Sequence, residues 1–412
     1  MLPTRRAAVA ATPCGVPDDF VAGHRLARRP MRVLFLARDL DTPSHEWMRR
    51  MARGLGPDLA ILATDRPAPA SAAKGLPVHV LPVPPLWSQV AGALGWLGYS
   101  PWNRLRGAAI ESLIARHAID CVLVHFLTTA VRYHEAWARC AKPVVVHCHG
   151  YDVTWDQRRD NGRPRHSADY VDRVRALPPN VSFIANSLAT KRRLISIGIA
   201  EQRIDVKYLG ATVPPRPPEL KPGEECTVVY VGRLVDFKGP DLVIQAFEIA
   251  CRQGLRGRLI LAGDGPLRKT CRRLKARSPY SDRIELLGAV DAATVEGLLK
   301  RADVFTAHNC LGPVTRQEEA FGVSIVEAMA WGLPVVSGRS GSLPEIVEHG
   351  REGILVEPGD LEGHAHALVR LAHSPELRTQ MGRQGWERAR TMFTLEREIQ
   401  TLREILTSRA NA

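Results

Sequence analysis

The 412-residue sequence lacks the patterns that mark several common classes of protein. None of its eight cysteines forms a Cys-x-x-Cys pair, so neither a zinc ribbon nor a disulfide framework is indicated. No apolar run of about 18 residues is present, which argues against a membrane-spanning helix. Residues 1–30 lack an apolar segment as long as that of a signal peptide. We expect them to form a disordered basic extension of a cytoplasmic protein.

Aromatic residues are also scarce, at 6%, and they are not interleaved with basic residues in a nucleic-acid-binding module. Nucleic acid is therefore not an expected partner. The 56 Lys and Arg exceed the 43 Asp and Glu, and the net charge of +13 favours anionic partners such as nucleotides or lipid head groups. A polyanion-binding protein without catalytic activity is one reading of this charge.

Alternating strand and helix patterns indicate an α/β protein with two Rossmann-like domains. Met31–Leu36 is the first buried strand, and a helix is predicted from about His45 to Gly54. Five prolines between residues 213 and 223 prevent regular structure, and the alternation restarts at Cys226. We assign residues 31–212 to an N-terminal domain, 213–225 to a linker, 226–390 to a C-terminal domain, and 391–412 to a C-terminal helix that can pack on either domain.

The segment from Glu319 to Pro334 has the features of an anion site. Two carboxylates, Glu319 and Glu327, lie eight positions apart on either side of Gly322, which can turn the chain tightly. Ser324 begins an apolar helical stretch, and the amides at its N-terminus favour a phosphate. The alternative is that Ser324 and Glu327 form a capping box that only satisfies backbone amides.

A basic loop follows the strand that ends at Val231. It places Arg233 and Lys238 between Gly232 and Gly239, where a guanidinium and an ammonium group can bind phosphate oxygens. In open α/β sheets, ligands bind outside this edge of the strands. The alternative is an ordinary basic loop.

The run Gly263-Asp264-Gly265-Pro266 also follows a predicted strand. Gly265 allows a ligand to approach closely, and Pro266 suits the first position of a helix. Because the third glycine of a dinucleotide fingerprint is missing, the run alone predicts a turn.

His147 and His149 follow a strand in the N-terminal half, on one face of an extended chain. A metal pair is one interpretation, but no third ligand has a defined spacing, and we predict no metal site. The other alternative is a histidine that ends a strand at a domain interface. Asp39 and Asp41 match an Asp-x-Asp metal motif, yet they are far in sequence from the cations, and we interpret them as turn residues.

Taken together, three motifs resemble one known family: Gly232-Arg-Leu-x-x-x-Lys-Gly239, Gly263-Asp-Gly-Pro266, and Glu319-x7-Glu327 with Ala328-Met-Ala-x-Gly-x-Pro334. They are similar to the retaining glycosyltransferases of the glycosyl transferases group 1 (GT4-like) family. The resemblance covers the C-terminal half almost completely and the N-terminal half more loosely. It implies a GT-B fold, in which two Rossmann-like domains face each other across a cleft, with the acceptor on the N-terminal domain and the nucleotide sugar on the C-terminal one.

The same resemblance implies roles for individual residues. Arg233 and Lys238 would bind the donor diphosphate, assisted by the segment Phe321, Gly322 and Val323. Glu319 would accept hydrogen bonds from sugar hydroxyls, and His149 would lie over the transferred sugar as the catalytic residue with Glu319. The residues expected near the donor ribose and base are Glu327, Leu287, Gly288, Gly263 and Gly265.

Some positions depart from the family pattern. Ala320 stands where the family often has glycine, and Ser342 replaces one of two paired glycines, so the sugar preference does not carry over. The first loop has Pro43-Ser44-His45-Glu46, which resembles exopolysaccharide-type members and places Ser44 and His45 on the acceptor side.

The resemblance implies sugar transfer from a nucleoside-diphosphate sugar to a glycan or lipid-linked acceptor, with retention and without a metal, in cell-surface polysaccharide or glycolipid synthesis. A sugar-nucleotide epimerase and a non-catalytic partner subunit are alternatives on the same fold. The apolar segment 86–102 is either buried or a surface that contacts anionic lipid at the inner face of the membrane.

Overall fold

The computed structural model describes most of the chain, and the segment from Met31 to the C-terminus forms one compact unit. The described residues are 29–40, 46–67, 74–82, 101–153, 159–160, 163–164, 166–217 and 225–411. The extension predicted over residues 1–30 therefore lies outside this description apart from Arg29 and Pro30. The acceptor-side candidates Ser44 and His45, and segment 86–102 up to Ser100, also lie outside it.

The first half of the chain contains, within the described ranges, a seven-stranded sheet in the order β3-β2-β1-β4-β5-β8-β9. All of its neighbours are parallel. Parallel strands covered on both faces are rich in Val, Ile and Leu, as here. The strands are β1 Val33–Ala37, β2 Leu59–Thr64, β3 Val78–Val80, β4 Cys121–His125, β5 Val144–His147, β8 Val181–Ala185 and β9 Ile204–Val206.

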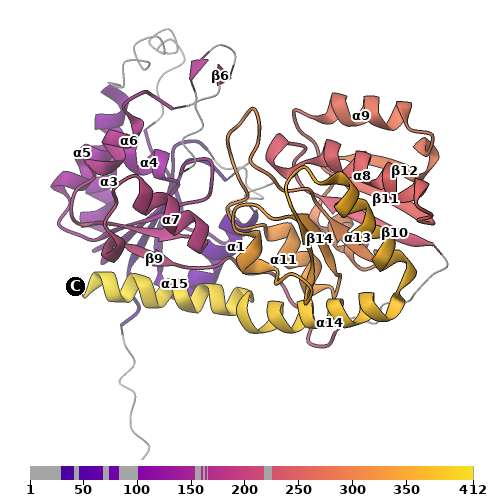
Figure 1. The fold of residues 1–412 in the computed structure, drawn as a ribbon. Helices are drawn as coiled ribbons and strands as arrows, with labels where there is room; N and C mark the ends of the chain where they lie inside the picture. Colours follow the sequence, from indigo (N-terminus) through magenta and orange to yellow (C-terminus); the bar gives the residue numbers. More distant parts are fainter. Residues whose placement is uncertain are drawn as a thin grey trace, which may run out of the picture. The chain divides into compact units, whose positions relative to one another are not determined.

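Helices connect these strands, and Figure 1 shows them around the first sheet. The described helices are α1 Glu46–Leu55, α3 Pro101–Arg116, α4 Leu127–Arg132, α5 His134–Arg139, α6 Tyr170–Arg175 and α7 Leu188–Ser196. The short strands β6 Arg159–Asp160 and β7 Arg163–Pro164 pair antiparallel outside the main sheet. The sequence pattern predicts helices at about His45–Gly54, Asn103–Ala118 and Ser187–Ile197, which agree with α1, α3 and α7 to within about two residues. It missed the six-residue helices, which are too short to show a repeat.

The second half contains a six-stranded sheet in the order β12-β11-β10-β13-β14-β15, again parallel throughout the described pairs. The strands are β10 Cys226–Val231, β11 Gly257–Ala262, β12 Ile284–Gly288, β13 Val304–Thr306, β14 Val335–Gly338 and β15 Gly353–Val356. The helices are α8 Pro240–Arg252, α9 Arg268–Arg277, α10 Ala292–Leu299, α11 Val323–Ala330, α12 Leu343–Ile346 and α13 Leu361–His373.

Both sheets have the doubly wound strand order, and this order determines where a ligand can bind. In each sheet the chain moves outward from its first strand and then returns to the other side, which places the reversal beside β1 and β4, and beside β10 and β13. Ligands of such folds bind outside the carboxyl ends of the strands at this reversal. The loops after β4, β5, β10 and β13 therefore lie where a ligand can bind.

The last two helices, α14 Pro375–Met392 and α15 Leu395–Ala410, follow the last strand. Helix α14 packs on the second half and α15 on the first. The break between them is at Phe393 and Thr394. The Thr394 hydroxyl caps α15 by accepting a hydrogen bond from the Arg397 amide. Figure 1 shows α14 beside the second half and α15 along the first half, where Arg409 bonds to Asp205 of β9.

A buried ion pair fixes α15 to the first half. Lys207, which follows β9, places Nζ 2.7 Å from Glu398 Oε1, with side chains that are 0% and 5% exposed. The other carboxylate oxygen of Glu398 accepts a hydrogen bond of 2.8 Å from the Gly210 amide. Arg403 on the same helix pairs with Asp58 at 2.9 Å. The C-terminal helix is therefore an integral part of the first half.

Candidate active site

The basic loop after β10 reaches the glutamate turn before α11. Lys238 lies at the end of a short 3-10 helix, and its Nζ is 2.5 Å from Glu319 Oε2. Gly239 follows with φ of 57°, and an added Cβ there would lie 2.4 Å from the His308 carbonyl oxygen. Only glycine fits this position, since it combines a left-handed backbone with a close contact. The loop after β13, which contains His308, therefore determines where Lys238 lies.

Glu319 is buried and surrounded by donors. Asn309 Nδ2 donates to Glu319 Oε2 at 3.2 Å, and the Phe321 amide also bonds to this carboxylate. Burial would raise the pKa of Glu319, but the charge and hydrogen bond of Lys238, with the charge of Arg233, outweigh it and lower the pKa. Glu319 is therefore an anion beside two cations. We call Arg233, Lys238, Asn309 and Glu319 the donor cluster, after the role that the sequence resemblance implies for Arg233 and Lys238.

The turn Phe321-Gly322-Val323 leads into α11, as predicted. Gly322 is the N-cap residue with φ of 90°, and no side chain caps the helix. The capping-box alternative is therefore wrong: Ser324 is the second residue of the helix, not its cap. The amides at this end of the helix remain suited to an anion.

Glu327 lies on α11 and faces the first half of the molecule. Burial raises the pKa of its carboxyl, and the charge of Arg50 on α1 opposes the rise. A carboxylate on one half and a guanidinium on the other thus act on each other. Sequence reasoning did not identify Arg50, because nothing in its local pattern marks it.

The glycines proposed for the ribose and base hold loops together. A Cβ at Gly263 would lie 1.8 Å from the Gly232 carbonyl oxygen, and one at Gly265 would lie 2.6 Å from that of Leu234. The Gly263 amide donates to the Gly288 carbonyl at 2.8 Å. These contacts join the ends of β10, β11 and β12, where Leu287 and Gly288 also lie. Pro266 is not the first residue of a helix, because α9 begins at Arg268.

His149 lies in a group of aromatic rings at the ends of β4 and β5. Its ring centroid is 4.3 Å from that of Trp47 on α1 and 4.7 Å from that of Phe126. Its Nε2 is 3.1 Å from Nδ1 of His125, the last residue of β4. Asp152 holds the loop, because its carboxylate accepts hydrogen bonds from the His149 amide at 3.0 Å and the Leu127 amide at 2.9 Å.

The loop with His149 meets the turn with Glu319. A Cβ added to Gly150 would lie 3.0 Å from the Ala320 Cβ, so the two backbones approach closely at this point. The residues predicted for catalysis, one on each half, thus lie on loops in contact. The register of β4 and β5, which pairs His125 with His147, brings a third histidine to the same place. Sequence reasoning missed His125 because no motif contains it.

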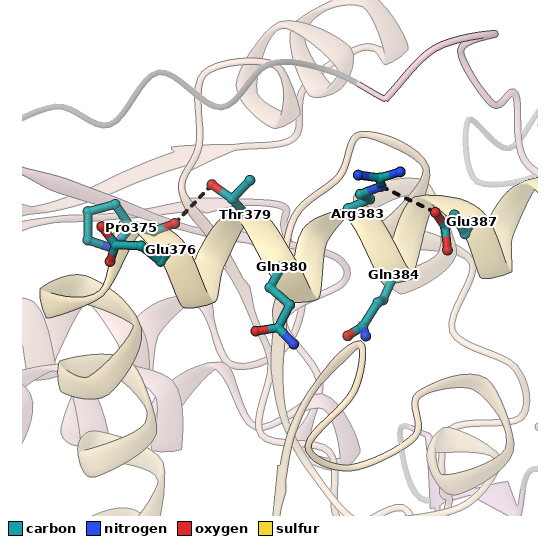
Figure 2. A pocket seen from close by; sticks show the side chains of 7 residues that line it. All are labelled: Pro375, Glu376, Thr379, Gln380, Arg383, Gln384 and Glu387. Atoms are coloured by element: carbon teal, nitrogen blue, oxygen red, sulfur yellow. Dashed lines mark hydrogen bonds and ion pairs between the residues drawn. The ribbon is translucent and has the colours of Figure 1, made fainter.

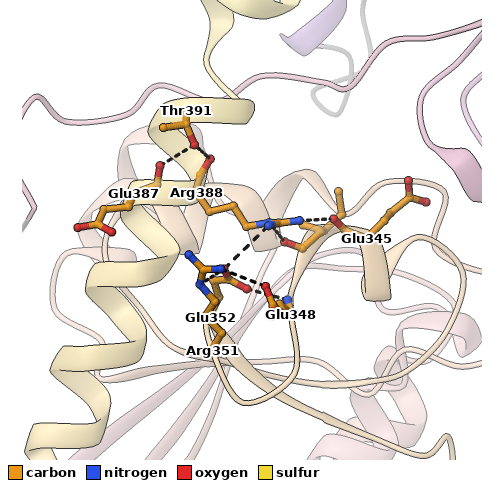
Figure 3. Close-up of polar contacts among 8 residues, drawn as sticks. Glu345, Glu348, Arg351, Glu352, Glu387, Arg388 and Thr391 are labelled. Carbon is orange, nitrogen blue, oxygen red and sulfur yellow. Dashed lines mark hydrogen bonds and ion pairs between the residues drawn. The ribbon is translucent and has the colours of Figure 1, made fainter.

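A second contact between the halves involves Glu345 on α12. Its carboxylate accepts hydrogen bonds from the amides of Leu188 at 2.8 Å and Ala189 at 3.0 Å, at the N-terminus of α7. Figure 3 shows Arg388 of α14 between Glu345 and Glu352. The Arg388 guanidinium donates a hydrogen bond to the Glu345 backbone carbonyl at 2.8 Å. Glu345 therefore acts in holding the halves together.

A surface hollow elsewhere contains none of the predicted residues. It is lined by α14 side chains between Pro375 and Glu387, where Thr379 bonds to the Pro375 carbonyl and Arg383 bonds to Glu387 (Figure 2). These contacts lie within one helix, so the hollow offers no converging groups for a ligand. Among the helices in the described ranges, none has both the length and the apolar character that crossing a membrane requires.

Comparison with family models gives matches to both halves. Residues 215–388 match the model of glycosyl transferases group 1, and residues 44–212 match that of glycosyltransferase family 4. In structure, the chain is similar to HepE of Anabaena in complex with UDP and glucose, with a TM-score of 0.72, 21% identity, and coverage of 92% of this chain and 100% of that chain. At this identity the likeness concerns the fold.

Two curated relatives are similar over part of the sequence. The amylovoran biosynthesis glycosyltransferase AmsK of Erwinia amylovora is 29% identical over 262 residues, 62% of this chain and 62% of that enzyme. The GDP-mannose-dependent alpha-(1-6)-phosphatidylinositol monomannoside mannosyltransferase of Mycobacterium tuberculosis is 31% identical over 165 residues, 40% of this chain and 43% of that enzyme. The match thus spans less than two thirds of each relative. The family models, together with the two doubly wound sheets, confirm that the chain belongs to the glycosyl transferases group 1 family, with its GT-B fold.

Proposed function

We propose that this protein is a retaining glycosyltransferase that moves a sugar from a nucleoside-diphosphate sugar to a hydroxyl of a glycan or lipid-linked acceptor in cell-surface polysaccharide or glycolipid synthesis. The contact between the His149-Gly150 loop and the Glu319-Ala320 turn carries this proposal. It brings the loop that carries His149 against the turn that carries Glu319. The amylovoran relative supports the polysaccharide assignment.

The donor cluster suits a leaving diphosphate. As the bond between the anomeric carbon and phosphate breaks, negative charge develops on the phosphate oxygen. Arg233, Lys238 and the amides at the start of α11 would stabilise that charge, which is the largest kind of contribution an enzyme makes to such a step. In the other major glycosyltransferase fold, a divalent ion stabilises the charge of the diphosphate. Here two cations and a helix N-terminus would stabilise it, so we propose that the donor site needs no metal.

Retention is what the sequence resemblance implies, and the surroundings of Glu319 are compatible with it. Glu319 is paired with Lys238 and Asn309, which suits a group that binds sugar hydroxyls better than a nucleophile. We propose transfer on the front face: the new bond from the acceptor oxygen to the anomeric carbon forms on the side from which the phosphate departs. The acceptor proton passes to the departing phosphate oxygen, so charge and atoms balance.

We also propose that the enzyme acts on the cytoplasmic side at the inner face of the membrane. On α7, Leu188 and Ile195 are 42% and 39% exposed, and Lys191, Arg192 and Arg193 lie between them. This combination of apolar and basic side chains suits an anionic lipid surface. Loss of sedimentation with anionic vesicles in a Leu188→Ser/Ile195→Ser variant would support the proposal, and unchanged sedimentation would contradict it.

The base of the nucleotide is left to experiment, since UDP is bound in the Anabaena structure and the mycobacterial relative is GDP-mannose-dependent. The decisive assay incubates the enzyme with labelled sugar nucleotides and glycan or lipid-linked acceptors and determines the anomer of the product by NMR. We expect a retained anomer, and a loss of about 10²-fold or more in a His149→Ala variant. An inverted anomer would refute retention, and sugar nucleotide consumed without any acceptor would favour the epimerase alternative.

A further inference from the structure

Three histidines converge at the carboxyl ends of β4 and β5. His125 and His147 are the last residues of these neighbouring strands and are paired in register, and His149 follows two positions later. One ring nitrogen from each lies within 4.8 Å of the others. We call these three residues the histidine cluster.

His147 needs a partner that the protein does not supply within the described residues. Its side chain is 0% exposed, and neither ring nitrogen has a hydrogen-bond partner among those residues. Buried polar groups are almost always paired, so such an orphan requires an explanation. A metal ion bound to one of its nitrogens would provide one.

The surroundings favour one class of ion. Metal ions bind the neutral form of imidazole. The cation Lys207 lies close enough to His147 to act on it electrostatically. The charge of Lys207 is balanced by Glu398 at 2.7 Å. Because the cluster offers imidazole nitrogens and no carboxylate, it suits Zn²⁺ or a similar transition metal and not Mg²⁺ or Ca²⁺.

One pair of ring nitrogens has nearly the spacing that a tetrahedral zinc site requires. Nδ1 of His125 and Nε2 of His149 are 3.1 Å apart. Two nitrogens bound tetrahedrally to zinc, each about 2.0 to 2.1 Å from it, would be about 3.3 Å apart. Ring rotations of His147 and a small separation of the other two would complete three ligands. The fourth position would be open to water.

We propose that His125, His147 and His149 form a binding site for one Zn²⁺-like transition metal ion, and that the bound ion inhibits sugar transfer by occupying the His149 ring. The proposed metal binding depends only on the geometry of the histidine cluster. The inhibition rests on the proposed function, in which His149 lies over the transferred sugar. The site is separate from the donor cluster, so it does not replace the cations that bind the diphosphate.

The test uses the full chain without a histidine tag, freed of metal by a chelator that is then removed. Co²⁺ is titrated and followed by its visible absorption, which is intense for tetrahedral nitrogen coordination, and Zn²⁺ is then added to displace it. We expect one equivalent to bind. His125→Asn and His147→Asn should each weaken Zn²⁺ binding at least tenfold, and the control His366→Asn, at an exposed position on α13, should leave it unchanged.

Each variant is checked by circular dichroism and thermal unfolding, so that a loss of fold is not taken for a loss of ligands. If His147→Asn does not fold, the binding of Zn²⁺ to the His125→Asn variant alone tests the metal site. Binding that is the same in the wild type and in the His125 variant, or no stoichiometric binding, would overturn the site and leave a hydrogen-bonded histidine pair.

The inhibitory role is measured separately. Zn²⁺ should reduce transfer in the wild type and a chelator should restore it. Stoichiometric binding with unchanged transfer would refute the inhibition but keep the site. If no transfer is found with any donor while Zn²⁺ still binds, the proposed function fails and the metal site stands.

Discussion

Lys238 Nζ lies 2.5 Å from Glu319 Oε2, although the two residues are 81 positions apart in the sequence. The pair joins the loop after β10 to the turn before α11. Its two members have different expected roles, since Lys238 would bind the diphosphate and Glu319 the sugar. Substitution at Glu319 should therefore separate nucleotide binding from transfer.

For Glu319→Gln we expect kcat/KM for transfer to fall by about 10²-fold, because the loss of a charged hydrogen-bond acceptor weakens the hold on the sugar in the transition state. Binding of the nucleoside diphosphate should be equal or tighter, since Lys238 loses its competing carboxylate. Calorimetry and initial rates measure the two effects. Glu396→Gln, at an exposed position on α15, is the control. A parallel loss of nucleotide affinity would contradict the assignment.

The position of Lys238 depends on Gly239. A Gly239→Ala variant should be destabilised by about 2 kcal/mol or more, because the added Cβ meets the His308 carbonyl oxygen at 2.4 Å in a left-handed backbone. Gly350→Ala is the matched control: φ is also positive, at 85°, but no atom lies within 4 Å. It should cost only about 1 kcal/mol of backbone strain. If urea unfolding shows that both variants lose the same free energy of unfolding, the close contact at Gly239 has no effect.

The buried pair of Lys207 and Glu398 should behave differently from a surface pair. Lys207→Met should lower the free energy of unfolding by about 3 to 5 kcal/mol, because it leaves a buried carboxylate without its counterion. Adding Glu398→Gln should recover much of this loss and keep the acceptor for the Gly210 amide. Arg409→Ala, which removes a partly exposed pair with Asp205, should cost less than about 1 kcal/mol. Additive effects of the two buried substitutions would argue against the pairing.

A histidine pair behind the Lys238 loop predicts a pH dependence. Nδ1 of His308 is 3.0 Å from Nδ1 of His364, and its Nε2 accepts the Gly359 amide. Burial lowers the pKa of His308 from 6.5 to about 4, and the charge of Asp360 partly opposes this shift. Because the folded state binds fewer protons than the unfolded state between these values, the stability present above pH 6.5 is lost as the pH falls towards 4.

This decrease of the unfolding free energy with falling pH should be measurable by urea unfolding from pH 7 to 4. In His308→Gln, the decrease in unfolding free energy over this range should be smaller by up to about 3 kcal/mol. Burial and the charge of His308 lower the pKa of the buried His364. The variant should therefore keep part of the pH dependence of the unfolding free energy. An identical pH profile in the variant would show that His308 is not the group responsible.

The sequence predicted the fold because alternation of apolar strands and helices is a local signal that needs no tertiary knowledge. Strand β10, for example, was predicted with its observed bounds. Helices α4 to α6 were not predicted, because six residues are fewer than two helical turns and do not establish the period of a helix. Strands β9 and β15 were not predicted either. The local rule that made Ser324 a cap failed because Gly322, in a left-handed conformation, begins the helix first.

For the site, motifs indicated Lys238 and Glu319, whose spacing in the sequence resembles a known pattern. His125 could not be found in this way, because it becomes a neighbour of His147 only through the register of two strands. Arg50 and Asn309 likewise depend on tertiary placement, since each acts on a glutamate of α11 or its preceding turn from a separate element. Residues that support a motif from elsewhere in the fold leave no local pattern.

The central claim is a donor site that binds a nucleoside diphosphate through side-chain cations. The most direct test is calorimetric binding of UDP, GDP and ADP in the presence of a chelator, with the native protein and an Arg233→Ala/Lys238→Ala variant. We predict that one nucleotide binds the native protein without metal and that the variant loses at least tenfold in affinity. No binding of any of the three, or equal binding by the variant, would contradict the donor site.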